Sequence, residues 1–201
     1  MPRVADHEQR RRQVAGAAMR VVAAAGMERV RVADVAAEAG VSVGLVQHYF
    51  RSKDDLLLFA FEHLCEQLTE RAFATGGPAG TRQGLFDWVS GFLAIGPVHT
   101  QELKVYLAFC GRAPDSERMR VAQAEAYERM RLALVQEIEL AQGNGLVPAW
   151  RDAKVEAIRL WALVDGLGLH GLADPDRLPA ETQLAVLDAH LAELFGGGEP
   201  R

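Results

Sequence analysis

The stretch that decides the fold is residues 33–53, which read ADVAAEAGVSVGLVQHYFRSK. Gly40 stands where a sharp turn needs a residue that tolerates positive φ, and Ala36 supplies the small side chain that two steeply crossing helices require. Ser42 follows the turn, where its hydroxyl can cap a second helix, and Val46 is placed to pin that helix against the first. We therefore predict a helix-turn-helix, a motif whose second helix lies in the major groove of DNA.

The second helix of this motif has an inward and an outward face. Val46 and Phe50 point to the core, whereas the residues between and before them point away or lie at the margins. An outward amide such as that of Gln47 can pair an adenine edge, and His48 can contact a base or a phosphate. The alternative is that these two side chains form an ordinary solvated face.

The same stretch resembles the N-terminal domain of the TetR family of transcriptional regulators. GVSVGLVQHYFRSKDDLL, residues 40–57, carries the family's GVS turn, the glycine of its recognition helix, its aromatic pair and the lysine that opens the next helix. The GLVQHYFRSK form and the chain length are closest to the BetI-like branch. The resemblance implies phosphate contacts for Tyr49, Lys53 and Arg31. The predicted DNA-binding residues are Arg31, Ser42, Val43, Gly44, Leu45, Gln47, His48, Tyr49 and Lys53.

The charge distribution supports this interpretation, although the chain of 201 residues has a net charge of -5. Residues 1–53 hold nine basic and five acidic residues, a net of +4, and the remainder carries -9. A basic N-terminal segment on an otherwise acidic chain is typical of a DNA-binding domain that contacts phosphates. The run Arg10–Arg12 offers further phosphate contacts, or is simply solvated.

Every long segment after the motif has helical periodicity, so we predict an all-α fold without strands. We expect a DNA-binding domain over 1–53 and an effector-binding and dimerisation domain over 54–201. Only two cysteines, Cys65 and Cys110, occur, the N-terminus lacks an apolar leader, and no apolar run reaches the ~18 residues that span a bilayer. These features predict a cytoplasmic protein with no membrane partner.

Two sets of residues in the body suggest partners. Aromatic and polar side chains on separate helices predict a pocket for a small effector, with plain core as the alternative. The pocket candidates are Phe61, Trp88, Phe92, His99, Tyr106, Phe109 and Trp161. Apolar stripes on the last two helices predict a homodimer through a four-helix bundle, unless they only close the chain's own core. The dimer candidates are Val155, Ile158, Ala162, Leu184, Leu187, Leu191 and Leu194.

Enzymatic chemistry finds no support in the sequence. The six histidines show no HExxH or paired metal spacing, and neither G-x-S-x-G nor Cys-x-x-Cys occurs. GLGLHG at 166–171 spells a dinucleotide-binding pattern, but helical spacing precedes it, so we expect its glycines to permit close helix packing at a dimer interface. We predict no catalytic residue, metal or cofactor.

The sequence as a whole predicts a dimeric regulator, a repressor released from a palindromic operator by an unidentified small molecule. An activator using the same head and a helical interaction scaffold are the alternatives.

Overall fold

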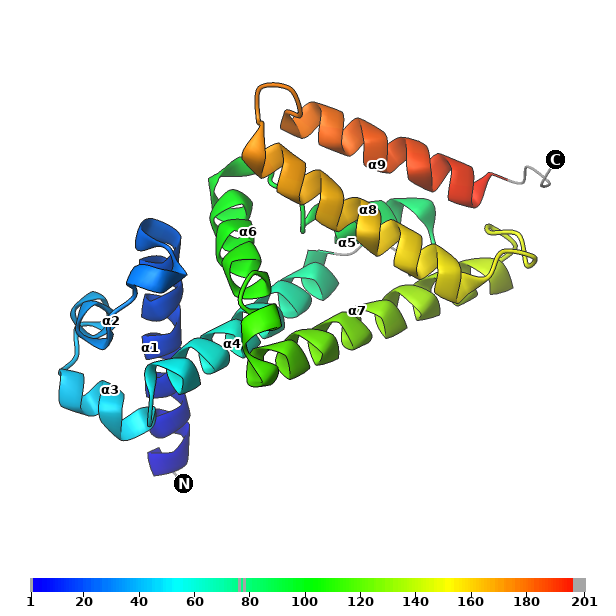
Figure 1. Cartoon of the computed structure of the whole chain (residues 1–201). Coiled ribbons are helices and arrows are strands. Elements are labelled where there is room, and N and C mark those ends of the chain that lie inside the picture. Colours follow the sequence, from blue (N-terminus) through cyan, green and yellow to red (C-terminus); the bar gives the residue numbers. More distant parts are fainter. Residues whose placement is uncertain (1, 76, 78, 197–201) are drawn as a thin grey trace. The chain divides into compact units, whose positions relative to one another are not determined.

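The computed structural model describes residues 2–75, 77 and 79–196, and over these residues the fold is all-α, as predicted (Figure 1). The helices are α1 (Pro2–Ala25), α2 (Val32–Ala39), α3 (Val43–Tyr49), α4 (Lys53–Thr75), α5 (Arg82–Ser90), α6 (Gly96–Cys110), α7 (Glu117–Gly143), α8 (Ala153–Ala173) and α9 (Ala180–Phe195), with 3-10 turns η1 (Met27–Arg29) and η2 (Ala113–Asp115). None of the helices in the described part is both long and apolar enough to cross a membrane.

The chain divides into two compact units. The first unit runs to Gln67 and also contains Lys104–Ala124, and the second holds Leu68–Leu103 and the chain from Glu125 onward. Helices α4, α6 and α7 each pass from one unit into the other. The two compact units thus do not divide the chain after residue 53, where we expect the functional boundary. That functional boundary stays a prediction.

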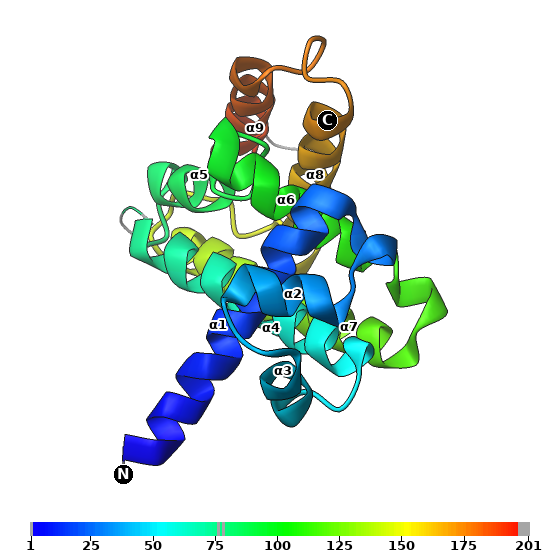
Figure 2. The ribbon, with the colours of Figure 1, turned by 90° about the vertical axis from the view of Figure 1, so that its left-hand side faces the viewer.

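In the first unit, α1 packs on the helix-turn-helix through small side chains (Figure 2). Val14 and Ala18 of α1 are fully buried and Ala36 of α2 is 2% exposed, because short side chains let the helix backbones approach closely. Gly26 ends α1 with φ 78° and Gly40 ends α2 with φ 66°, both in the left-handed region that glycine adopts without strain. The turn predicted at Gly40 is confirmed.

In the second unit, α8 and α9 lie side by side and antiparallel (Figure 1). Their close approach depends on Gly171, because a Cβ built there would lie 2.5 Å from Cδ of Gln183 on α9. A Cβ on Gly168 would lie 3.0 Å from Leu103, whereas one on Gly166 meets nothing. Two of the three glycines of GLGLHG therefore serve packing inside the unit, contrary to the expectation that they act at a dimer interface.

Candidate DNA-binding surface and effector groove

The local geometry of α3 is the one that its sequence predicts. Ser42 has extended backbone (φ -75°, ψ 151°), and its Oγ accepts a hydrogen bond from the backbone N–H of Leu45 at 3.2 Å. Val46 is 1% exposed and Phe50 is 5% exposed, so the inward face is firmly packed. The cap and the core contact together fix which side of this short helix faces outward.

The outward face of α3 is polar and open. Ser42, Val43, Gly44, Gln47 and His48 are exposed, and Leu45 and Tyr49 are half-buried at its margins. The structure thus brings the predicted base-reading residues together on one helix surface that no other part of the first unit covers. Contact of these residues with DNA stays a prediction.

Two further predicted residues lie where helices begin. Arg31 is exposed at the start of α2, and its side chain makes no capping hydrogen bond. Lys53 opens α4, and its Nζ donates to the backbone carbonyl of Glu28 at 3.5 Å. Both cations are at helix N-termini, where backbone N–H groups favour an anion such as a phosphate.

The basic run at 10–12 is more engaged with the protein than a solvated run would be. The guanidinium of Arg11 lies 4.1 Å from the ring centre of Phe59 and 5.5 Å from that of Phe50, which makes it a packing group of α1. Arg12 pairs with Glu8 at 3.4 Å. Arg11 therefore holds α1 against the aromatic side chains that follow α3.

The predicted effector residues fall into two groups. In the first unit, Phe61 contacts Phe109 (5.3 Å between ring centres) and Tyr106 (6.3 Å). In the second unit, Phe92 packs edge-on against Trp161 at 5.1 Å. Phe92 lies two residues beyond the end of α5 at Ser90.

Most of these aromatic side chains are core in their own unit. Phe61 and Phe109 are 1% and 0% exposed, and Trp88 is 5% exposed. His99 differs, because it lines a groove of about 360 Å³ in the second unit, with Phe86, Ile95 and Leu184 forming apolar walls. The groove's other lining residues are Leu68, Arg71, Asp87, Ser90 and Gly91. Arg71 binds Glu102 through two hydrogen bonds of 2.7 Å.

The dimer candidates also divide. Leu187, Leu191 and Leu194 are 0–1% exposed in the core of the second unit, so their stripe closes the chain's own core, and Leu184 lines the groove. Val155 and Ile158 are 49% and 52% exposed, and Ala162 is exposed beside them. Of the seven predicted dimer residues, these three are the ones that stay exposed.

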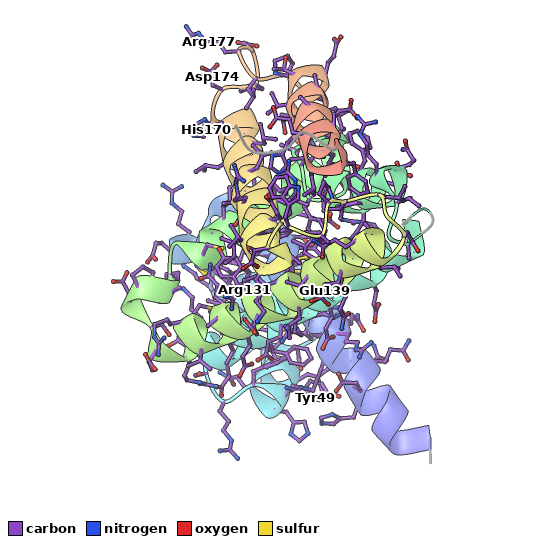
Figure 3. All side chains as sticks on the ribbon, turned by 90° about the vertical axis from the view of Figure 1, so that its right-hand side faces the viewer. Tyr49, Arg131, Glu139, His170, Asp174 and Arg177 are labelled. Atoms are coloured by element: carbon purple, nitrogen blue, oxygen red, sulfur yellow. The ribbon has the colours of Figure 1, made fainter. Side chains whose placement is uncertain are left out.

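A carboxylate that the sequence did not single out shares this face of α8. Asp165 follows Ile158 and Ala162 at helical spacing, and burial raises the pKa of its side chain to about 6. Other polar side chains lie farther along the chain: Figure 3 shows His170 near the end of α8, and Asp174 and Arg177 in the loop beyond it. In the described part of the chain, no three His, Cys, Asp or Glu residues gather as a metal site would require.

A capped helix-turn-helix with a polar outward second helix, carried on a larger helical body, defines a class: helix-turn-helix transcriptional regulators. Comparison with known proteins identifies the family. Residues 82–196 match the C-terminal model of BetI-type transcriptional repressors, and residues 16–59 match the model of bacterial regulatory proteins of the tetR family. The chain belongs to the TetR family of transcriptional regulators, as its sequence motif indicated.

Individual relatives agree along almost the whole chain. The HTH-type transcriptional regulator PksA of Bacillus subtilis (strain 168) is 32% identical, covering 96% of this chain and 94% of the relative. BetI of Cronobacter sakazakii is 27% identical, covering 100% and 98%.

Two solved structures share the fold. A transcriptional regulator of Rhodococcus sp. Rha1 has a TM-score of 0.82 at 29% identity, covering 94% of this chain and 99% of its own. A regulator of Saccharomonospora viridis, solved in complex with choline, has a TM-score of 0.82 at 26% identity, covering 92% and 96%.

Proposed function

We propose that this protein is a cytoplasmic repressor that binds a palindromic operator as a homodimer and leaves it when a small molecule binds. The observation that carries the proposal is the exposed polar face of α3, fixed by the Ser42 cap and the buried Val46. Gln47 and His48 on that face have the groups that read base edges in a major groove. A pure scaffold would not need this face, whereas an activator would use it in the same way.

The dimer is supported by an inverted pattern on α8. Glu156 is 5% exposed, while its neighbour Val155 and the following Ile158 are about half exposed. Glu156 is buried because Arg151 pairs with it at 3.0 Å and Arg159 at 3.3 Å. A helix that turns a carboxylate inward and branched apolar residues outward implies that its outer face is covered by another protein surface. A second copy, packing α8 and α9 as a four-helix bundle, fits this face.

The effector is proposed to bind in the body of the protein, where the groove beside His99 offers apolar walls and polar groups together. The complex of the Saccharomonospora viridis relative with choline supports a small-molecule ligand for this fold. The chain's aromatic side chains suit a quaternary ammonium, and they suit a drug-like or fatty molecule equally well. A ligand that favours one distance between the two DNA-binding domains of a dimer by about 1–3 kcal/mol is enough to change operator occupancy.

Ion pairs within the first unit offer a route from the α6–α7 connection to the DNA-binding helices. Arg112 pairs with Glu28 of η1 at 2.8 Å, and the backbone carbonyl of Glu28 also accepts from Lys53 at the start of α4. Arg118 pairs with Asp55 of α4 at 2.6 Å. Movement of residues 111–118 would therefore reach the elements that position α3.

The test is fluorescence anisotropy on DNA flanking the protein's own gene, and on a duplex selected from a randomised pool, across a salt series. Gln47→Ala should weaken binding to the selected duplex by about tenfold to a hundredfold, since a bidentate base contact discriminates by about 1–3 kcal/mol. Tyr49→Phe should weaken all duplexes more evenly and leave the salt slope nearly unchanged, because a neutral hydroxyl displaces no counterion.

Gln136→Ala is the matched control, because Gln136 is an exposed glutamine on α7 in the unit without the motif. Binding that ignores both sequence and Gln47→Ala would refute the operator proposal and favour the scaffold.

A further inference from the structure

The buried stripe of α1 continues toward the N-terminus as a series of aromatic contacts. Val14 and Ala18 are fully buried, and one turn earlier Arg11 lies over Phe59. One turn earlier again, His7 contacts Tyr49, with ring centres 4.6 Å apart and planes at 83°. Because residues 7, 11, 14 and 18 follow helical spacing, His7 belongs to the face that α1 presents to the motif.

Tyr49 lies between two imidazoles at the end of α3. His7 approaches it from α1, and His48 contacts it at 5.4 Å from the preceding position of its own helix. Both histidines are exposed and Tyr49 is half-buried, so the three rings form a small polar surface beside the outward face of α3. Figure 3 shows Tyr49 on this helix. Edge-on contacts from His7 and His48 restrict the Tyr49 ring.

We propose that His7 and Tyr49 form a paired contact for one phosphate of the operator backbone, with His7 donating as an imidazolium. The inference rests on the proposed DNA-binding function and adds a residue of α1 to it. A tyrosine hydroxyl and an imidazolium are both donors, and two donors from different helices fix the register of a backbone more firmly than one.

The charged groups around His7 leave it open to an external anion. On α1, Glu8 pairs with Arg11 at 3.7 Å and with Arg12 at 3.4 Å, so its carboxylate is already engaged by guanidinium groups. Arg10 and Arg11 are the other described charges near it on this helix, and His48 and Tyr49 are those that α3 contributes. A phosphate placed against Tyr49 would lie beside the His7 ring, because the two rings are in contact.

Proton uptake follows from this geometry. A neighbouring phosphate favours the charged form of an imidazole, so complex formation should bind a proton. Operator affinity should then rise as the pH falls through the range in which histidines titrate, between about pH 8 and pH 6. A histidine that only packs against Tyr49 would give no such slope.

The experiment measures the dissociation constant of the full-length protein for the selected operator duplex from about pH 6 to pH 8.5 at fixed ionic strength. The wild type should bind about threefold to tenfold more tightly at pH 6 than at pH 8, since one proton gives at most tenfold per pH unit. His7→Gln should lose at least half of this slope on a logarithmic scale. The control variant is His170→Gln, which replaces an exposed histidine of α8 and should keep the full slope.

The outcomes separate the two proposals. A wild-type slope that persists in His7→Gln, or that disappears only in His48→Gln, overturns the paired contact and leaves the operator proposal intact. If no duplex is selected by the folded wild-type protein, the proposed function itself fails. Circular dichroism of each variant confirms that a loss of slope does not come from unfolding of α1.

Discussion

Gly171 on α8 is the position where the structure predicts the sharpest effect of one added methyl group. A Cβ there would lie 2.5 Å from Cδ and 2.9 Å from Oε1 of Gln183, far inside normal contact distance. Gln183 is 1% exposed, and its Nε2 donates to the backbone carbonyl of Leu178 at 3.1 Å. Gly171→Ala must therefore displace the amide end of Gln183, which breaks its hydrogen bond to Leu178, or push α8 away from α9.

The magnitude follows from three opposing contributions. Overpacking a core costs about 1–3 kcal/mol, and breaking the hydrogen bond of Gln183 costs about 0.5–1.5 kcal/mol more. Replacing glycine by alanine within a helix returns about 1 kcal/mol. We expect Gly171→Ala to lower the free energy of unfolding by about 2 kcal/mol, which for a chain of this size corresponds to a drop of about 4–8 °C in Tm.

The assay is urea or thermal unfolding at one fixed protomer concentration, with Gly16→Ala on α1 as control. A Cβ on Gly16 lies 3.7 Å from Arg20, an ordinary contact, so that variant should be stabilised by about 0.5–1 kcal/mol. In the Gln183→Ala background, Gly171→Ala should become neutral or stabilising. Additive effects of the two substitutions would refute the steric argument.

Three further effects are expected. Asp165→Asn should raise the free energy of unfolding at pH 7.5 by up to about 3 kcal/mol, because burial raises the pKa of the Asp165 carboxyl from 3.8 to about 6. The folded wild type therefore binds the proton more tightly than the unfolded chain, so its stability rises as the pH falls through 6 and should equal that of the variant near pH 4. Parallel stability profiles of the two proteins against pH would exclude this. Ser42→Ala removes the acceptor for the N–H of Leu45, so unfolding should cost about 1 kcal/mol less and operator affinity should fall; unchanged urea midpoints would count against the cap. Arg112→Ala and Glu28→Ala should change operator affinity by the same factor, and the double variant by no more, with stability changes below about 1 kcal/mol; independent effects in anisotropy would separate the pair.

The helix-turn-helix could be predicted from the sequence because its determinants are local. Ser42 caps a helix that begins one residue later, and Gly40 makes the turn just before it. The same holds for Thr81, whose Oγ1 accepts from the N–H of Gly84 at 3.1 Å at the start of α5. Short-range hydrogen bonds and positive φ angles leave direct signatures in the order of residues. The outward face of α3, which is the proposed DNA-reading surface, follows from them.

His7 was missed because its partner is distant in the chain. The charged N-terminal segment looked like a solvated run, and nothing in its composition shows that α1 reaches Tyr49. The signal was present as spacing, since His7 and Arg11 extend the stripe of Val14 and Ala18 by two helical turns. A polar residue in register with a buried stripe is therefore worth testing as a contact when the stripe leads toward a functional surface.

The last two helices show why periodicity alone cannot assign an interface. Leu187 and Leu191 of α9 and Val155 and Ile158 of α8 all recur at helical spacing, yet the first pair is buried and the second is half exposed. What separates them is the polar residue beside them. Glu156 lies inside the unit, held by two arginines, and ionic burial of this kind is costly unless the groups are fully paired. A helix that turns Glu156 inward and leaves Val155 and Ile158 outward is the pattern on which the proposed α8 interface rests. Burial of Leu187 and Leu191 thus places the α9 stripe in the chain's own core, and the exposure of Val155 and Ile158 supports the proposed interface on α8.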